Sequence, residues 1–182
     1  MANPTKRNYD RTSFIMIVDD DDTLLKFFKI HLNKFFSRVI VVPNASEAIE
    51  TLRTREIDLV ISDIRMPKMD GLQLMKKVRA HDASIPYIIV SGALLTDEQV
   101  VTCETIADGF LSKPFGVDEL HNLIDFGLKR RELLKELATL LPSNKAMNEV
   151  LFGAGSVEKL AGTVSKDRAK ELLGELKAKT AA

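Results

Sequence analysis

Short apolar runs alternate with longer amphipathic segments over the first two thirds of this chain. Five of these runs are too short and too rich in β-branched side chains for helices, and turn formers or charged residues bound each of them. We predict strands at "FIMIV" (14–18), "RVIVV" (38–42), "DLVIS" (58–62), "YIIVS" (87–91) and "GFLS" (109–112).

Between these strands, apolar residues recur at helical spacing. We predict Asn44 as an N-cap, Thr96 as the N-cap of a fourth helix at about 97–106, and a fifth helix that begins near Val117. Strands that alternate with helices favour an α/β fold whose parallel sheet is covered on both faces. Ligands bind such sheets beyond the carboxyl ends of the strands, so chemistry is expected there.

Polar residues stand at four of the five strand ends. The first strand is followed by four aspartates at 19–22, and the others by Asp63, Ser91 and Lys113. Carboxylates that converge on one edge repel each other unless a cation joins them. Oxygen ligands without nearby cysteine or histidine favour Mg²⁺, and a hydroxyl with an ammonium suits a phosphoryl oxygen. Asp63 is therefore a candidate nucleophile, because carboxylates can form acyl phosphates.

Each of these features also has a simpler interpretation. An acidic run after a strand is more often a solvated loop or a helix N-terminus, where the helix dipole stabilises negative charge. We expect that role for Asp21 and Asp22. A single lysine or serine at a strand end is more often surface decoration. Only the combination at successive strand ends favours the chemical interpretation.

Composition narrows the class of protein. The chain has 182 residues, 45% of them hydrophobic, and no net charge, which argues against a wholly basic nucleic-acid binder. One cysteine allows no intrachain disulfide. The N-terminus has no apolar core, and no apolar run approaches the roughly 18 residues of a membrane span. We expect a cytoplasmic protein with a disordered segment at 1–12 and no membrane partner.

Four motifs together resemble those of response-regulator receiver domains: "IVDDDDTLL", "DLVISDIRMPKMDGLQLM", "IIVSG" and "GFLSKPF". They occur in the family's order and spacing over residues 13–128. The resemblance implies a flavodoxin-like (βα)₅ fold with strand order 2-1-3-4-5. It also implies a phosphoprotein of a bacterial two-component system or phosphorelay, and not an enzyme with a separate substrate.

The resemblance assigns roles around the phosphoryl group. Asp63 matches the phosphoacceptor, which receives its phosphoryl group from a sensor histidine kinase or a phosphotransfer protein and also ligates Mg²⁺. Asp20 matches the direct Mg²⁺ ligand, and Asp19 matches its partner, which acts mainly through water. The backbone carbonyl of Arg65 would complete the protein's share of the coordination.

Further positions match the residues that sense phosphorylation. Lys113 matches the lysine that pairs with phosphoryl oxygens, and its bond to Pro114 is expected to be cis. Ser91 matches the switch hydroxyl, and Phe110 the aromatic ring that turns inward when Ser91 moves. The surface of helix four, strand five and helix five is thereby repacked. Gly71 is expected to ease the turn into the third helix.

Some positions depart from this pattern or carry little signal. Arg65 and Ala93 occupy positions that tune the phosphoryl lifetime in this family. Neither offers an amide or acid to orient water, so we expect slow dephosphorylation. We expect surface positions for His31, His81 and His121, and a packing role for Cys103.

The apolar face of the fifth helix continues to Pro142. We therefore predict a helix extension at 129–141 and a small helical tail at 142–182, an all-helical C-terminal extension. The extension must bury its leucines, which are Leu133, Leu134, Leu137 and Leu140. A second copy in a short coiled coil and the chain's own last 40 residues are equally good partners.

Three functions remain open from the sequence. The first is a receiver-type regulator whose extension mediates homodimerisation or partner docking. The second is a DNA-binding regulator, since the tail is mildly basic, although groove-reading residues are scarce there. The third is an aspartyl-phosphate hydrolase, for which neither a general acid nor a substrate cap is visible.

Overall fold

The computed structural model describes residues 9–140 except 93–95, 97–98, 101–102 and 104–106. The elements described are β1 (Phe14–Val18), α1 (Asp22–Leu32), β2 (Arg38–Val42), α2 (Ala45–Thr54), β3 (Leu59–Asp63), α3 (Gly71–His81), β4 (Tyr87–Ser91), β5 (Gly109–Ser112) and α5 (Val117–Leu140). The predicted tail at 142–182, Ala93 and residues 1–8 lie outside the described part.

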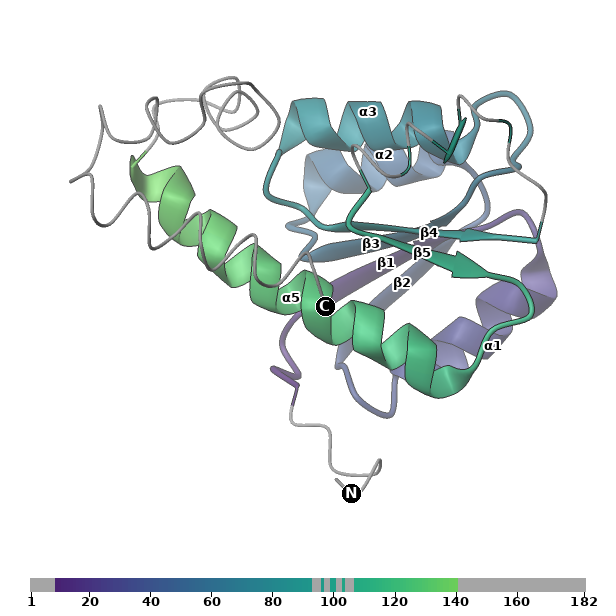
Figure 1. Cartoon of the computed structure of the whole chain (residues 1–182), viewed down its shortest axis with the longest axis horizontal. Coiled ribbons are helices and arrows are strands. Elements are labelled where there is room, and N and C mark those ends of the chain that lie inside the picture. Colours follow the sequence, from purple (N-terminus) through teal and green to yellow (C-terminus); the bar gives the residue numbers. More distant parts are fainter. Residues whose placement is uncertain (1–8, 93–95, 97–98, 101–102, 104–106, 141–182) are drawn as a thin grey trace.

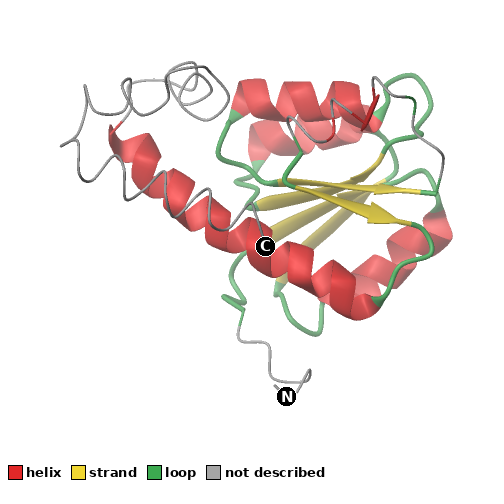
Figure 2. Ribbon diagram, viewed as in Figure 1, coloured by secondary structure: helices red, strands yellow, loops and turns green. Residues whose placement is uncertain are grey.

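The five strands form one parallel sheet in the order β2-β1-β3-β4-β5, which confirms the predicted (βα)₅ architecture. Helices α2 and α3 cover one face of the sheet, and α1 and α5 cover the other (Figure 1). Figure 2 shows the same three layers coloured by secondary structure. Within the described residues, no helix is long and apolar enough to cross a membrane.

Two apolar cores flank the sheet because side chains alternate along each strand. In β1, Met16 and Val18 pack toward α2 and α3, whereas Ile15 and Ile17 pack toward α1 and α5. Strands β1, β3 and β4 are buried throughout, as continuous apolar runs predict. Each fully buried aliphatic side chain stabilises the fold by about 1.5–3 kcal/mol relative to exposure.

Helix starts follow the capping residues in the sequence. Asn44 accepts a hydrogen bond from the Glu47 amide and caps α2, as predicted. The Thr96 hydroxyl accepts a hydrogen bond from the Gln99 backbone amide at 3.3 Å. The Gln99 side chain in turn accepts a hydrogen bond from the Thr96 backbone amide at 3.1 Å. The cap predicted for a fourth helix is therefore present, and Cys103 is buried as predicted.

The surface position expected for His121 is wrong. His121 lies on α5 and is only 2% exposed, where α5 packs against α1. The His121 Nδ1 lies 2.8 Å from the Tyr9 hydroxyl, and its Nε2 lies 2.8 Å from the Nε2 of His31. His31 is half-buried and His81 is exposed. The packing of α5 against α1 explains the difference, because this pairing is not visible from either helix alone.

Acidic residues also stand just before β3, β4 and β5, at the edge opposite Asp63. We call Asp58, Asp82 and Asp108 the amino-end acids. Arg130 of α5 pairs with Asp108, which also binds Arg79 of α3, and all three side chains are at most 7% exposed.

Two further cations of α5 bind the other amino-end acids. Arg131 donates to Asp82 at 2.8 Å and to the Ile57 carbonyl at 3.2 Å, and Lys135 donates to Asp58 at 2.7 Å. The distal half of α5 is thus held by its own receiver. Leu134 is fully buried and Leu133 is half-buried. The side chains of Leu137 and Leu140 lie outside the described part.

Candidate functional site

Asp19 and Asp63 leave the sheet side by side. Val18 at the end of β1 pairs with Ser62 of β3, so the next residue of each strand reaches the same edge. Both carboxylates are buried, with exposures of 2% for Asp19 and 6% for Asp63. The neighbouring order of β1 and β3 thus produces the convergence that the sequence predicts.

Lys113 joins the two carboxylates. Its Nζ lies 2.9 Å from Oδ2 of Asp19 and 2.7 Å from Oδ1 of Asp63. Its backbone amide donates to the Ser91 carbonyl at 2.9 Å, and the Lys113–Pro114 peptide is cis, as predicted. A Cβ on Gly92 would stand 3.4 Å from the Lys113 Cβ, which is ordinary van der Waals contact, so Gly92 lies against the lysine stem.

The charges of this site are unbalanced. Burial raises the pKa of Asp19, against the hydrogen bonds that it accepts from the Asp21 amide and from Lys113. Burial by itself lowers the pKa of Lys113, but hydrogen bonds to Asp63 and Asp19 outweigh burial and raise the pKa. One ammonium between two buried carboxylates leaves excess negative charge, and exposed Asp20 adds to it. Such a site favours an additional cation.

The four aspartates after β1 divide between two tasks. Asp21 accepts hydrogen bonds from the amides of Thr23 and Leu24 and caps α1, while Asp22 lies in the first helical turn. Both therefore have the helix N-terminal role that we predicted. Asp19 and Asp20 remain at the edge for chemistry.

The loop after β3 closes tightly over Asp63. The Arg65 amide donates to the Asp63 carboxylate, and the Gly71 amide donates to the Ile64 carbonyl at 2.9 Å. A Cβ on Gly71 would lie 2.1 Å from the Asp63 carbonyl oxygen, so no larger residue fits this position. Close backbone approach, and no unusual φ angle, is the reason for this glycine.

The two predicted switch residues lie on neighbouring strands. Ser91 is buried and follows Val90, which pairs with Asp63, so it occupies the same edge of the sheet. Phe110 on β5 is 40% exposed. The structure thus brings Asp19, Asp63 and Lys113 into contact and holds Ser91 at the same edge, whereas Phe110 lies at the surface.

The donor set suits a hard cation. Asp19, Asp20 and Asp63 offer carboxylate oxygens, and Arg65 offers a backbone carbonyl in the adjoining loop. These are the oxygen ligands that Mg²⁺ prefers. In the part of the chain that the structure describes, however, no three His, Cys, Asp or Glu side chains form a group that could hold a metal ion.

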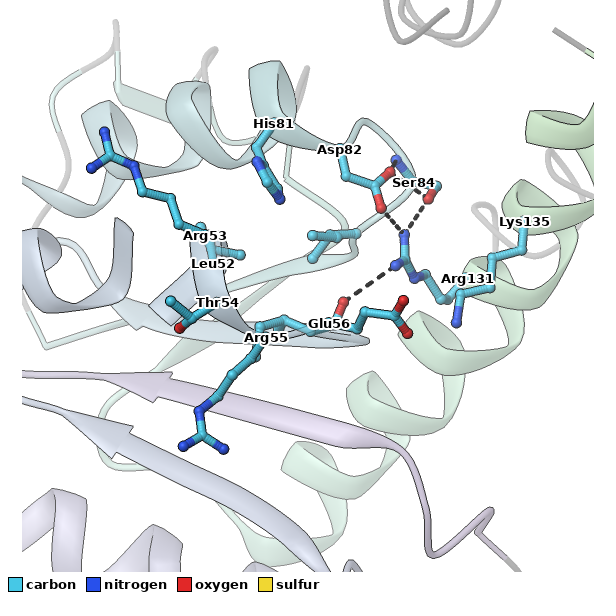
Figure 3. A pocket seen from close by; sticks show the side chains of 12 residues that line it. Leu52, Arg53, Thr54, Arg55, Glu56, His81, Asp82, Ser84, Arg131 and Lys135 are labelled. Carbon is cyan, nitrogen blue, oxygen red and sulfur yellow. Dashed lines mark hydrogen bonds and ion pairs between the residues drawn. The ribbon is translucent and has the colours of Figure 1, made fainter. Parts of the chain in front are cut away.

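A groove lies at the opposite edge of the sheet, away from Asp63. It measures about 680 Å³ and is lined by residues that precede β3 and β4 together with Arg131 and Lys135 of α5. Figure 3 shows Arg131 directed at Asp82 and Ser84 across this groove. The charges of Arg131 and Lys135 are already balanced by the amino-end acids.

Sequence reasoning missed a buried polar pair beneath Asp63. The Ser62 hydroxyl donates to the Asp63 carbonyl at 2.9 Å, and the Tyr87 hydroxyl donates to the Gly71 carbonyl at 2.9 Å. Both side chains are fully buried. The signal was a hydroxyl residue in each of two predicted strands of a sheet that is covered on both faces.

Comparisons with known proteins agree with this geometry. The family model described as "Response regulator receiver domain" matches residues 15–125. Transcriptional regulatory protein GlrR of Escherichia coli is 31% identical over 66% of this chain and 27% of its own length. Alkaline phosphatase synthesis transcriptional regulatory protein PhoP of Bacillus subtilis is 25% identical over 76% of this chain and 55% of its own length.

Solved structures give the same answer. A CheY-like response regulator receiver domain protein from Methanospirillum hungatei is 28% identical, with a TM-score of 0.63, over 69% of this chain and 98% of that one. This chain spans only about a quarter to a half of the length of GlrR and PhoP, so the match concerns their receiver parts. The sheet order, the acidic edge and the family model lead to one conclusion: this chain belongs to the response regulator receiver family.

Proposed function

We propose that this chain is the phosphoacceptor of a two-component system or phosphorelay, and that Asp63 receives the phosphoryl group with Mg²⁺ bound. The observation that carries this proposal is the buried bridge from Lys113 to both Asp63 and Asp19. It positions a nucleophilic carboxylate, a permanent cation and excess negative charge at one sheet edge.

The transfer requires few parts from the protein. A carboxylate oxygen of Asp63 attacks the phosphorus of a phosphohistidine, a new O–P bond forms, and the P–N bond breaks. The imidazole nitrogen leaves with the electron pair and takes up a proton from solvent. Lys113, whose raised pKa keeps it charged, exchanges an Asp63 oxygen for a phosphoryl oxygen. Bound Mg²⁺ would neutralise charge on the transferring group.

Exposed apolar side chains support a donor docking beside this edge. Phe27 is 40% exposed and Ile30 is 68% exposed on α1, the helix that follows the aspartates. A partner that covers them gains from apolar burial. We propose that the donor, a histidine kinase or a phosphotransfer protein, contacts α1 while its histidine reaches Asp63.

Phosphorylation would act on the output surface through Ser91 and Phe110. The new phosphoryl oxygens attract the Ser91 hydroxyl, and the exposed ring of Phe110 gains apolar contact if it moves inward. This change repacks the surface next to α5 and controls protein contacts. Promoter binding is a second candidate output, favoured by the names of GlrR and PhoP. DNA protection that weakens with rising salt would support it.

The first test is phosphoryl incorporation from a small acyl phosphate such as acetyl phosphate, read by intact mass. We expect wild type with Mg²⁺ to gain one phosphoryl group, and Asp63→Asn or chelated wild type to gain none. Equal incorporation by Asp63→Asn would contradict the assignment. Failure of wild type with both the acyl phosphate and a phosphohistidine donor would overturn the proposed function.

A further inference from the structure

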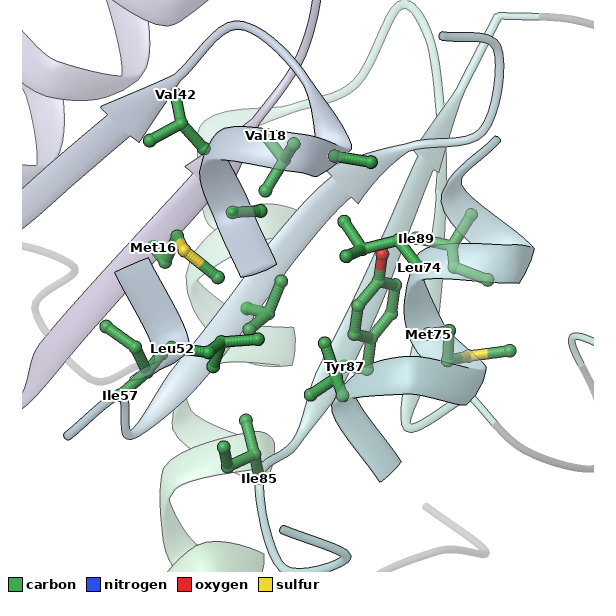
Figure 4. Packing of buried hydrophobic residues seen from close by; sticks show 14 of the residues in the cluster. Met16, Val18, Val42, Leu52, Ile57, Leu74, Met75, Ile85, Tyr87 and Ile89 are labelled. Carbon is green, nitrogen blue, oxygen red and sulfur yellow. The ribbon is translucent and has the colours of Figure 1, made fainter. Parts of the chain in front are cut away.

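Tyr87 carries a polar group into the centre of an apolar core. It is the first residue of β4, is fully buried, and packs among Leu74, Met75 and Ile89 (Figure 4). Its hydroxyl donates to the Gly71 carbonyl at 2.9 Å. An aliphatic residue would fill the core without any polar requirement.

A hydroxyl at this depth must keep its partners. Burying an unpaired hydroxyl is costly, so the bond to the Gly71 carbonyl stabilises the buried Tyr87 side chain. Burial also raises the pKa of Tyr87 well above its ordinary value, although a hydrogen bond with Ser62 opposes this. The phenol therefore stays neutral and remains a hydrogen-bond donor at every pH where the protein is studied.

Gly71 is the point where the loop over Asp63 closes. It is the first residue of α3, and its amide donates to the Ile64 carbonyl at the start of the loop. The Asp63 carbonyl occupies the space where a side chain of Gly71 would be. The loop over Asp63 begins at the end of β3 and ends at Gly71. The Tyr87 hydroxyl thus holds the C-terminal end of this loop.

This loop touches the reactive carboxylate directly. The Arg65 amide donates to the Asp63 carboxylate, and Lys68 takes a positive φ of 71° that the tight path requires. A shift of Gly71 would move the Arg65 amide and carbonyl together, since only five residues separate them.

We propose that Tyr87 is a positioning residue for the phosphoacceptor site: through Gly71 it fixes the loop that presents Arg65 to Asp63 and to a bound Mg²⁺. This inference rests on the proposed function. It gives Tyr87, on the core face of β4, a role in phosphoryl acceptance in addition to its role in packing.

The test compares Tyr87→Phe with Ile88→Val in the full chain. Phenylalanine keeps the ring and removes only the hydroxyl. Ile88 is the next residue on the same strand, is fully buried and belongs to the other core, so its variant reports a packing loss without contact with the loop. Thermal melting establishes that both variants are folded.

Two readouts separate positioning from general stability. The first is amide hydrogen exchange at Arg65 and Gly71 in metal-free protein, and the second is the Mg²⁺ dissociation constant from calorimetry. We expect Tyr87→Phe to raise both by about threefold to tenfold, the factor that the net loss of one buried hydrogen bond gives. Ile88→Val should leave both within about twofold of wild type.

The outcomes distinguish the two proposals. If wild type accepts a phosphoryl group but Tyr87→Phe matches Ile88→Val in exchange and in Mg²⁺ affinity, the positioning role is wrong and the proposed function stands. If wild type neither binds Mg²⁺ nor accepts a phosphoryl group, the proposed function fails first. Faster exchange at Arg65 and Gly71 with weaker Mg²⁺ binding supports the positioning role.

Discussion

At the scale of single residues, the site depends on one lysine between two buried carboxylates. Lys113 offsets only one of the two negative charges, and the side chain of Asp19 is the more buried, with 3% of it exposed against 8% for Asp63. The motif residues were predictable because each directly follows a strand. Tyr87 was not, because its partner Gly71 is set by the packing of β4 against α3.

Asp19 gives the chain a defined dependence of stability on pH. Its pKa is higher in the folded state than in the unfolded state, where it is near 3.8. The folded state therefore binds more protons than the unfolded state. The stabilising contribution of protonated Asp19 to the free energy of unfolding is complete below pH 3.8, and it is lost as pH rises through the raised folded pKa.

We expect Asp19→Asn in metal-free buffer to raise the free energy of unfolding, with a gain that grows from about pH 4 and levels off above the raised folded pKa of Asp19. Urea denaturation of wild type and variant at several pH values measures this difference. Exposed Asp22→Asn is the control for removal of a carboxylate outside the buried site. A difference that is constant with pH would contradict the expectation.

At the scale of elements, α5 is fixed by charge as well as by its apolar face. Its arginines bind the amino-end acids at the edge opposite Asp63. The apolar periodicity of the distal half predicts that its leucines need an apolar partner. The structure shows Leu134 fully buried and, in addition, Arg130 and Arg131 buried against the chain's own receiver, which no periodicity of leucines could reveal.

Asp108 is the centre of this contact, because it pairs with both Arg79 and Arg130. We expect Asp108→Asn to destabilise the protein by about 3–5 kcal/mol, since it leaves buried guanidinium charges without a carboxylate. Arg130→Met should cost less, because Asp108 keeps Arg79. Urea midpoints of the two variants measure this order, and a larger loss for Arg130→Met would contradict it.

At the scale of the whole molecule, α5 connects the two edges of the sheet. It begins near Lys113 at the phosphoacceptor edge and ends beyond the amino-end acids, as Figure 1 shows. Under the proposed function, a change in the packing of β5 and α5 after phosphorylation would reach the distal half of α5 through this helix. Self-association through the helix extension, one of the two partners that the sequence leaves open, belongs to this scale.

We expect light scattering to show a shift from monomer to dimer when Mg²⁺ and beryllofluoride, a mimic of the phosphoryl group, are added. The reason is that inward movement of Phe110 creates a new surface on β5 and α5 for a second copy. Asp63→Asn should stay monomeric under the same conditions. An unchanged mass for wild type would instead favour docking of a different partner on the activated surface.

The sequence by itself determined the strand order, through its resemblance to a family, and the residues of the acidic edge. This was possible because a polar residue directly after a buried strand must appear at the carboxyl edge of the sheet. Tertiary structure alone decided the pairing of His31 with His121, which are 90 residues apart, and of α5 with the amino-end acids. Such contacts depend on how helices and strands pack across the sheet. No local pattern of apolar and polar residues specifies which residues far apart in the sequence will meet.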